Sequence, residues 1–170
     1  MSVRVQVGGE SDLPAWLDLA REVEPLFGPM VDRPEFLAVL VKHLGRGSAF
    51  CVRVEDRPPD APLLGGLLWS ARRGAIGWLA VAGAARRRGV GAALVRHVLG
   101  QVPAGSAVWV ATFCGDDEVA RAAHGFYTAL GFLPAEIAPL GAAGEDRRVY
   151  RRPAGPSVEP DQGASLPSTP

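Results

Sequence analysis

The sequence predicts a mixed α/β fold, a central β-sheet flanked by helices. Segments in which apolar and polar residues alternate with period two are interspersed with segments whose apolar residues recur at helical spacing. The 21 glycines and 15 prolines mark the turns between them. A chain of 170 residues can bury about 70% of its unfolded surface. It therefore needs no disulfide framework to fold.

The first half of the chain predicts two helices and four strands. Residues 3–7 alternate as a strand, and residues 13–20 have helical spacing, with Ser11 or Asp12 as N-cap and Pro14 in the first turn. Residues 22–31 contain prolines and a glycine, and we expect a loop there. A second helix is expected after Asp32. Three more strands are expected at residues 49–54, 63–70 and 76–81.

The second half predicts two helices and two or three strands, which gives a sheet of about six to seven strands. A helix follows residues 86–91, and residues 107–113 form an apolar strand. Asp116 and Asp117 open a helix whose apolar face ends at Leu130, with Gly131 at the C-cap position. The last strands are expected at residues 132–133 and 147–152.

Net charge and hydropathy exclude two classes of protein. The chain has 18 basic and 18 acidic side chains, whereas a nucleic-acid-binding protein is expected to have a basic face. The longest apolar run, residues 75–85, is shorter than the roughly 18 residues of a membrane span. The first residues are polar and resemble no signal peptide. We expect a soluble, cytoplasmic protein with neither a nucleic-acid nor a membrane partner.

Cysteine and histidine offer little for redox or metal chemistry. Cys51 and Cys114 lie in apolar stretches and are expected to be buried free thiols. His43, His97 and His124 are far apart and have no ligand spacing, so no metal is expected.

Composition divides the chain at one point. Residues 153–170 contain five prolines and no lysine, arginine or aromatic residue. Such a segment cannot bury enough apolar surface to offset its ordering entropy. We expect a single domain over residues 1–152 and a disordered proline-rich tail over residues 153–170.

The segment that indicates chemistry is residues 76–94, an apolar strand that leads through an Ala/Gly turn into a helix. The loop at the start of this helix suits a diphosphate. Its unpaired N–H groups can donate hydrogen bonds to phosphate oxygens, its glycines allow close approach, and its arginines supply positive charge. The loop residues are Arg86, Arg87, Arg88, Gly89, Val90, Gly91 and Ala92. The loop lacks the Gly-Lys-Ser/Thr ending of a P-loop and the third glycine of a dinucleotide fingerprint. The alternative is a glycine-rich turn with solvated arginines.

Two motifs in this order resemble the GNAT superfamily of acyl-CoA-dependent N-acetyltransferases. Arg86, Gly89 and Gly91 match its Arg/Gln-x-x-Gly-x-Gly/Ala signature. Tyr127, followed by Gly131 and Phe132, is similar to its tyrosine-bearing helix that ends in Gly-Phe. The resemblance covers residues 63–132 well and the N-terminal strand and helices more loosely. It implies a sheet splayed between its fourth and fifth strands.

The resemblance also implies a reaction. Acetyl-CoA would be the co-substrate, with its pantetheine arm along Leu79, Ala80 and Val81 and its diphosphate on the N–H groups from Arg87 to Ala92. A primary amine would attack the thioester directly in a ternary complex, and Tyr127 would protonate the departing thiolate. Tyr127 has a second interpretation, as a core aromatic with its hydroxyl at the rim.

The sequence departs from the family pattern in three places. Ala120 stands where an asparagine is common, residues 82–85 lack the frequent acidic residue and proline, and residues 108–113 contain no glutamate to act as base. Candidates for the base are Glu22, Glu24, Asp116, Asp117, Glu118 and His124, with a water chain as the alternative. Glu24 is favoured as a catalytic and substrate-binding residue, and Phe27 as a substrate-binding residue, because their loop is too apolar for a surface connection. The other interpretation of that loop is a packing support.

The sequence therefore predicts an N-acetyltransferase acting on a small-molecule or peptide amine. The alternative is an inactive binding module of the same fold that sequesters a small molecule or CoA. A third interpretation is a regulator that binds a nucleotide other than CoA. The acceptor, the acyl length and a homodimeric state are left open.

Overall fold

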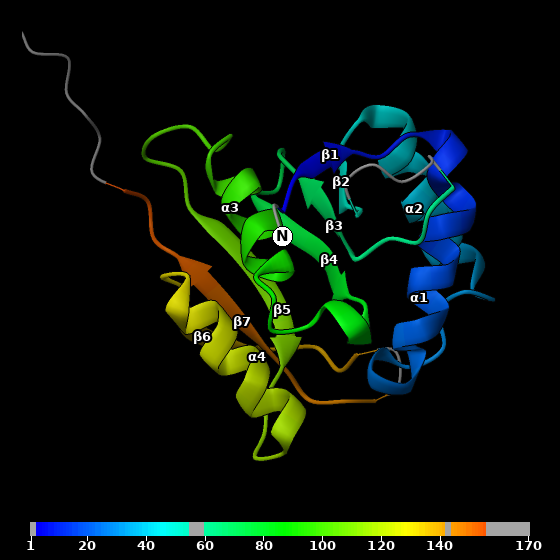
Figure 1. The fold of residues 1–170 in the computed structure, drawn as a ribbon. Helices are drawn as coiled ribbons and strands as arrows, with labels where there is room; N and C mark the ends of the chain where they lie inside the picture. Colours follow the sequence, from blue (N-terminus) through cyan, green and yellow to red (C-terminus); the bar gives the residue numbers. More distant parts are fainter. Residues whose placement is uncertain (1–2, 55–59, 142–143, 156–170) are drawn as a thin grey trace, which may run out of the picture.

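The computed structural model describes residues 3–54, 60–141 and 144–155, which form one seven-stranded sheet with helices on both faces (Figure 1). The strand order is β1-β2-β3-β4-β5-β7-β6. The strands are β1 (Val5–Val7), β2 (Ala49–Val52), β3 (Gly65–Ser70), β4 (Ala75–Val81), β5 (Val108–Phe113), β6 (Leu133–Ala138) and β7 (Arg147–Arg152). The helices are α1 (Leu13–Phe27), α2 (Pro34–Arg46), α3 (Val90–Leu99) and α4 (Glu118–Ala129), with 3₁₀ turns η1 (Glu10–Asp12) and η2 (Gly83–Ala85).

One pair of neighbouring strands differs from the rest. All the other neighbours in the described sheet are antiparallel, but β4 and β5 are parallel and pair at two positions, Ala75 with Trp109 and Ile76 with Val110. Beyond these pairs the strands diverge. The register between β3 and β4 shifts at this point, where Gly77 has no partner and forms a β-bulge. A bulge bends its strand and increases its twist, which directs the rest of β4 away from β5.

Two adjacent glycines in β3 let helices approach the sheet closely on both faces. A Cβ on Gly65 would lie 2.7 Å from Val90 of α3, and a Cβ on Gly66 would lie 2.6 Å from Trp16 of α1. Successive strand residues point to opposite faces, so α1 and α3 cover opposite faces of the sheet. Helix α2 lies on the side of α1, and α4 lies on the side of α3 (Figure 1).

Helix α1 is longer than predicted, which corrects the loop expected over residues 22–31. The helix continues through Pro25 and ends at Gly28, whose φ is 83°. Pro25 is exposed, and its missing N–H removes one helical hydrogen bond. The apolar face that buries Trp16 and Val23 continues into this turn. Packing therefore outweighs the local preference against a helix.

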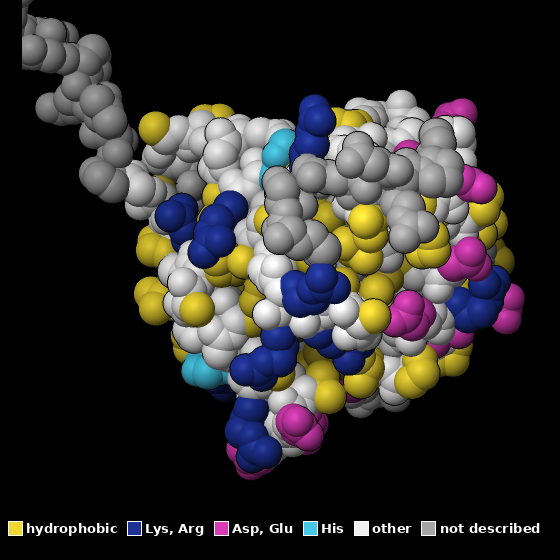
Figure 2. Space-filling view, viewed as in Figure 1, with side chains coloured by type: hydrophobic (Ala, Val, Ile, Leu, Met, Phe, Trp, Pro, Cys, Tyr) yellow, Lys and Arg dark blue, Asp and Glu magenta, His cyan; other side chains and the backbone are white. Residues whose placement is uncertain are grey.

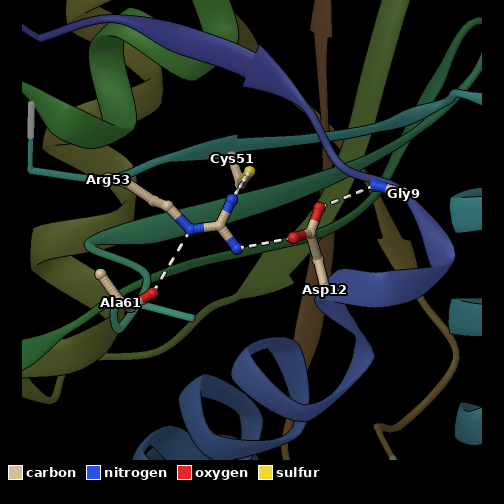
Figure 3. A network of polar contacts seen from close by, with 5 residues as sticks. All are labelled: Gly9, Asp12, Cys51, Arg53 and Ala61. Atoms are coloured by element: carbon tan, nitrogen blue, oxygen red, sulfur yellow. Dashed lines mark hydrogen bonds and ion pairs between the residues drawn. The ribbon is translucent and has the colours of Figure 1, made fainter. Parts of the chain in front are cut away.

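Asp12 does not cap α1 as predicted, although it occupies the N-cap position. One of its carboxylate oxygens accepts a hydrogen bond from the N–H of Gly9 at 2.8 Å, and the other accepts one from Arg53 at 2.9 Å (Figure 3). The two side chains of this ion pair are 10% and 13% exposed. Arg53 also donates to the carbonyl of Ala61. The network ties the start of α1 to the end of β2.

Most of the remaining predicted elements are confirmed with small changes of boundary, and residues 147–152 match β7. The strand expected at residues 132–133 is longer and later in the chain, as β6. Gly131 has a φ of 86°, as expected beyond the end of α4. Cys51 and Cys114 are free thiols, but only Cys51 is fully buried. Burial raises the pKa of the Cys51 thiol to about 11. None of the described helices has the length and apolar character needed to cross a bilayer. Residues 156–170 of the predicted tail lie outside the described residues.

Candidate active site

The divergence of β4 from β5 opens a cleft of about 460 Å³ on the side of α3 and α4, here called the α3 cleft. It is bounded by β4, the loop into α3 and one face of α4, and also by the end of β5 and the last turns of α1. Nine of the ten residues predicted to bind CoA line it: Leu79, Ala80, Val81, Arg86, Arg87, Gly89, Val90, Gly91 and Ala92. Arg88 is exposed and does not line the cleft. The structure thus brings the signature loop and the end of β4 together around one space.

The start of α3 has the geometry of an anion-binding helix terminus. Gly89 is the N-cap with a φ of 81°, and no side chain caps the first turn. Its N–H groups are therefore available to a ligand. Arg87 also has a positive φ, 59°, which is uncommon outside glycine. Figure 2 shows basic side chains over the loop between β4 and α3, next to hydrophobic ones.

A second pocket, of about 350 Å³, lies on the side of α2 and is here called the α2 pocket. Its walls come from the α1–α2 connection, the middle of β4, the end of β5 and the start of β7. Five residues line both spaces: Phe27, Leu79, Thr112, Phe113 and Tyr127. The rings of Phe27 and Phe113 are in contact, with centroids 5.2 Å apart. The two spaces therefore meet where β4 and β5 separate.

Tyr127 lies at this junction. Its side chain is 5% exposed and packs against the rings of Phe126, Phe132 and Tyr150. Its hydroxyl forms no hydrogen bond with the described residues. Burial raises the pKa of Tyr127, and the charge of Arg147 opposes this in part. The phenol is therefore protonated at neutral pH and able to donate a hydrogen bond into either space.

Glu24 lines neither space. Its carboxylate accepts hydrogen bonds from the N–H groups of Met30 and Val31, both at 2.8 Å. These two bonds lower the pKa of Glu24. Met30 lines the α2 pocket, so Glu24 supports a wall of the pocket from behind. These contacts favour the packing interpretation of the segment, whereas Phe27 does line both spaces.

Asp117 is the N-cap of α4, with its carboxylate 2.8 Å from the N–H of Ala120. His124 contacts the hydroxyl of Tyr150 at 2.9 Å. Neither residue lines the α3 cleft or the α2 pocket. The other candidate bases, Glu22, Asp116 and Glu118, line neither space.

Sequence reasoning missed the charged residues of the α2 pocket. Arg33, Glu35, Glu145 and Arg147 line it. Glu35 lies in the first turn of α2, and Glu145 lies just before β7. No spacing in the sequence connects these positions. The one signal in the sequence is that Glu35 closely follows the apolar segment of residues 22–31.

A family model described as an acetyltransferase (GNAT) domain matches residues 46–134, more than half of the chain. The chain belongs to the GNAT acetyltransferase family. The matched range contains both landmarks, the loop into α3 and the Tyr127 helix. It also includes β4, β5 and the split between them.

Solved GNAT structures share this fold. A GNAT-family acetyltransferase from Bacillus cereus ATCC 10987 has a TM-score of 0.69 at 15% identity, covering 92% of this chain and all of that one. The ribosomal-protein-S18-alanine N-acetyltransferase from Escherichia coli has a TM-score of 0.68 at 16% identity, and the match covers 97% of this chain and 100% of that one. A phosphinothricin acetyltransferase from Sinorhizobium meliloti, solved with AcCoA, has a TM-score of 0.66 at 19% identity, and the match covers 96% of this chain and 95% of that one. No curated protein sequence matches this chain significantly.

Proposed function

We propose that this GNAT acetyltransferase transfers an acetyl group from acetyl-CoA to a primary amine by direct attack in a ternary complex. One observation carries the proposal: the α3 cleft and the α2 pocket meet at the split between β4 and β5, and Tyr127 lines both. Two substrates that enter from opposite faces of the sheet would meet at that point. Holding both in one geometry supplies much of the acceleration of such a reaction.

The α3 cleft suits the donor. Its backbone edge at Leu79, Ala80 and Val81 pairs with β3 on one side and, among the described strands, has no partner on the other. The uncapped N–H groups of α3 and the side chains of Arg86 and Arg87 provide positive charge for a diphosphate. When bound, acetyl-CoA supplies a thioester whose sulfur leaves as a thiolate.

In the proposed step, the amine nitrogen bonds to the acetyl carbon and the carbon–sulfur bond breaks. Tyr127 gives its proton to the sulfur and regains one that the amine releases through water. The carboxylates of Glu35 and Glu145 attract the acceptor's ammonium group to the α2 pocket, which Arg33 and Arg147 also line. The ammonium group gives one proton to water and attacks as the neutral amine. Glu24 acts indirectly, by holding Met30 in the wall of the pocket.

The test is thiol release from acetyl-CoA with a panel of amines, with the product identified by mass. A parallel melting experiment with CoA and with ATP reports donor binding separately from transfer. Transfer to at least one amine, with stabilisation by CoA and not by ATP, is the expected result. Stabilisation by CoA without transfer to any amine would instead favour the inactive binding module.

A further inference from the structure

A basic groove of about 920 Å³ adjoins the α2 pocket. It is formed by the second half of α2, the turn between β3 and β4, and the first residues of β4, β5 and β7. Ile76, Gly77, Ala111 and Arg147 line both the groove and the α2 pocket. A molecule whose reacting end lies in the pocket can therefore extend into the groove.

The groove concentrates positive charge in a chain that is neutral as a whole. Lys42, Arg46, Arg72, Arg73 and Arg147 line it, and none of its described lining residues is acidic. These five cations form no ion pair with the described residues.

The surroundings of the groove reinforce this charge. No Asp or Glu occurs between Ala61 and Gly115, the stretch that supplies its β3, β4 and β5 walls. His43 does not add to this charge in the same way: burial lowers its pKa, the hydrogen bond to Ser48 opposes this in part, and the charges of Lys42 and Arg46 lower the pKa further.

We propose that the acceptor is the amino terminus of an acidic peptide, whose carboxylates bind in the basic groove while its ammonium group enters the α2 pocket. This inference rests on the proposed acetyl transfer. The charges are placed as such a peptide requires. All the carboxylates of the two spaces, Glu35 and Glu145, lie in the pocket, beside Arg33 and Arg147, whereas the groove beyond adds Lys42, Arg46, Arg72 and Arg73 and no described carboxylate. Complementary charges of this kind favour both encounter and register.

The groove fits a peptide better than a nucleic acid. Single-stranded nucleic acids bind to basic channels that also offer aromatic faces for stacking. Here Trp69 is 6% exposed, and the indole N–H of Trp109 donates to the carbonyl of Arg73 at 3.0 Å. The carboxylates at the end of the path would also repel phosphates. Among the described lining residues, the groove thus offers five cations to carboxylates and, of its tryptophan rings, only the partly exposed one of Trp109 to a base.

Peptide binding is measured directly, by fluorescence anisotropy of peptides with a free amino terminus and a label at the other end. One peptide carries Asp and Glu after its first residue, and its analogue carries Asn and Gln. We expect the acidic peptide to bind about tenfold more tightly at low salt, with the advantage shrinking as salt rises. Equal affinities at low salt would overturn the proposal.

A matched pair of variants locates the effect. In Lys42→Gln/Arg72→Gln/Arg73→Gln, the ratio of the two affinities is expected to fall to about one. The control, Arg4→Gln/Arg96→Gln/Arg121→Gln, removes three exposed cations outside the groove, and the ratio is expected to persist. The melting shift with CoA checks that both variants fold. Loss of the ratio in the control, or its persistence in the groove variant, would contradict the assignment.

The outcomes separate this inference from the proposed function. Transfer to amines with no preference for acidic peptides would overturn the inference and leave the function standing. Selective binding of acidic peptides without transfer to any amine would contradict the function, because binding is measured without acetyl-CoA. An oligonucleotide of equal charge that binds more tightly than the peptide would overturn the choice of a peptide.

Discussion

At the scale of single residues, Tyr127 can be tested without disturbing the core. Tyr127→Phe removes the hydroxyl and keeps the ring that packs against Phe126 and Phe132. We expect the transfer rate to fall by about 10²-fold, the lower end for a general acid because a thiolate leaves easily. The melting shift with CoA should be retained. Unchanged turnover, where chemistry limits the rate, would make Tyr127 a core residue only.

Glu24 predicts a pH dependence of stability. Hydrogen bonds from Met30 and Val31 lower its pKa in the folded protein from the ordinary value of 4.5. Between the two pKa values the unfolded chain binds more protons, so stability rises with pH there. The stabilisation is complete above 4.5 and is lost as pH falls through the lower, folded value.

Urea unfolding of Glu24→Gln tests this. The variant should be less stable than the parent at neutral pH, and the difference should vanish in acid. Glu10→Gln is the control and should show neither effect, because Glu10 is exposed and its carboxylate accepts no hydrogen bond from the described residues. A difference for Glu24→Gln that persists in acid would mean that its carboxylate charge is not responsible.

At the scale of elements, the space in the α3 cleft beside the first turn of α3 depends on Gly91, which has no side chain. A Cβ on Gly91 would lie 3.2 Å from the ring of Phe126 and 3.4 Å from Val81. Gly91→Val would place its methyl groups in the α3 cleft. We expect it to abolish the stabilisation by CoA, which at 100 times the dissociation constant is about 2.7 kcal/mol. In the control, Gly125→Val, a Cβ meets nothing within 4 Å. The control should retain the CoA shift. If Gly91→Val retains it too, the assignment of this cleft to the donor is wrong.

At the scale of the whole molecule, residues 153–170 are predicted to be dispensable. Their composition provides too few apolar side chains to extend a core. Deleting them should leave the melting temperature and the transfer rate nearly unchanged. A drop of several degrees would show that the tail docks on the domain.

Sequence patterns predicted most of this fold because each strand and helix records its own apolar period. They failed at α1, where packing of an apolar face carries the helix through Pro25. That β4 and the start of α3 line one cleft was also predictable, because they are continuous in the chain; that this cleft binds the donor stays a prediction. The acceptor side was not predictable, because Glu35, Glu145 and the basic groove come from distant segments that only the sheet order brings together. Side-chain partners such as those of Glu24 leave no periodic signal.

The short pairing between β4 and β5 also has a mechanical consequence. Within the described sheet, two residue pairs join the half-sheet of strands β1–β4 to the half-sheet of strands β5, β7 and β6. Because so few pairs connect them, we expect the two half-sheets to rock about Ile76 and Val110. A ligand in the α3 cleft would contact β4 of the first half-sheet and β5 of the second, together with α4, and would thus connect the two half-sheets. We therefore expect the amides of both half-sheets to exchange more slowly together when the cleft is filled, as hydrogen exchange with and without CoA would show.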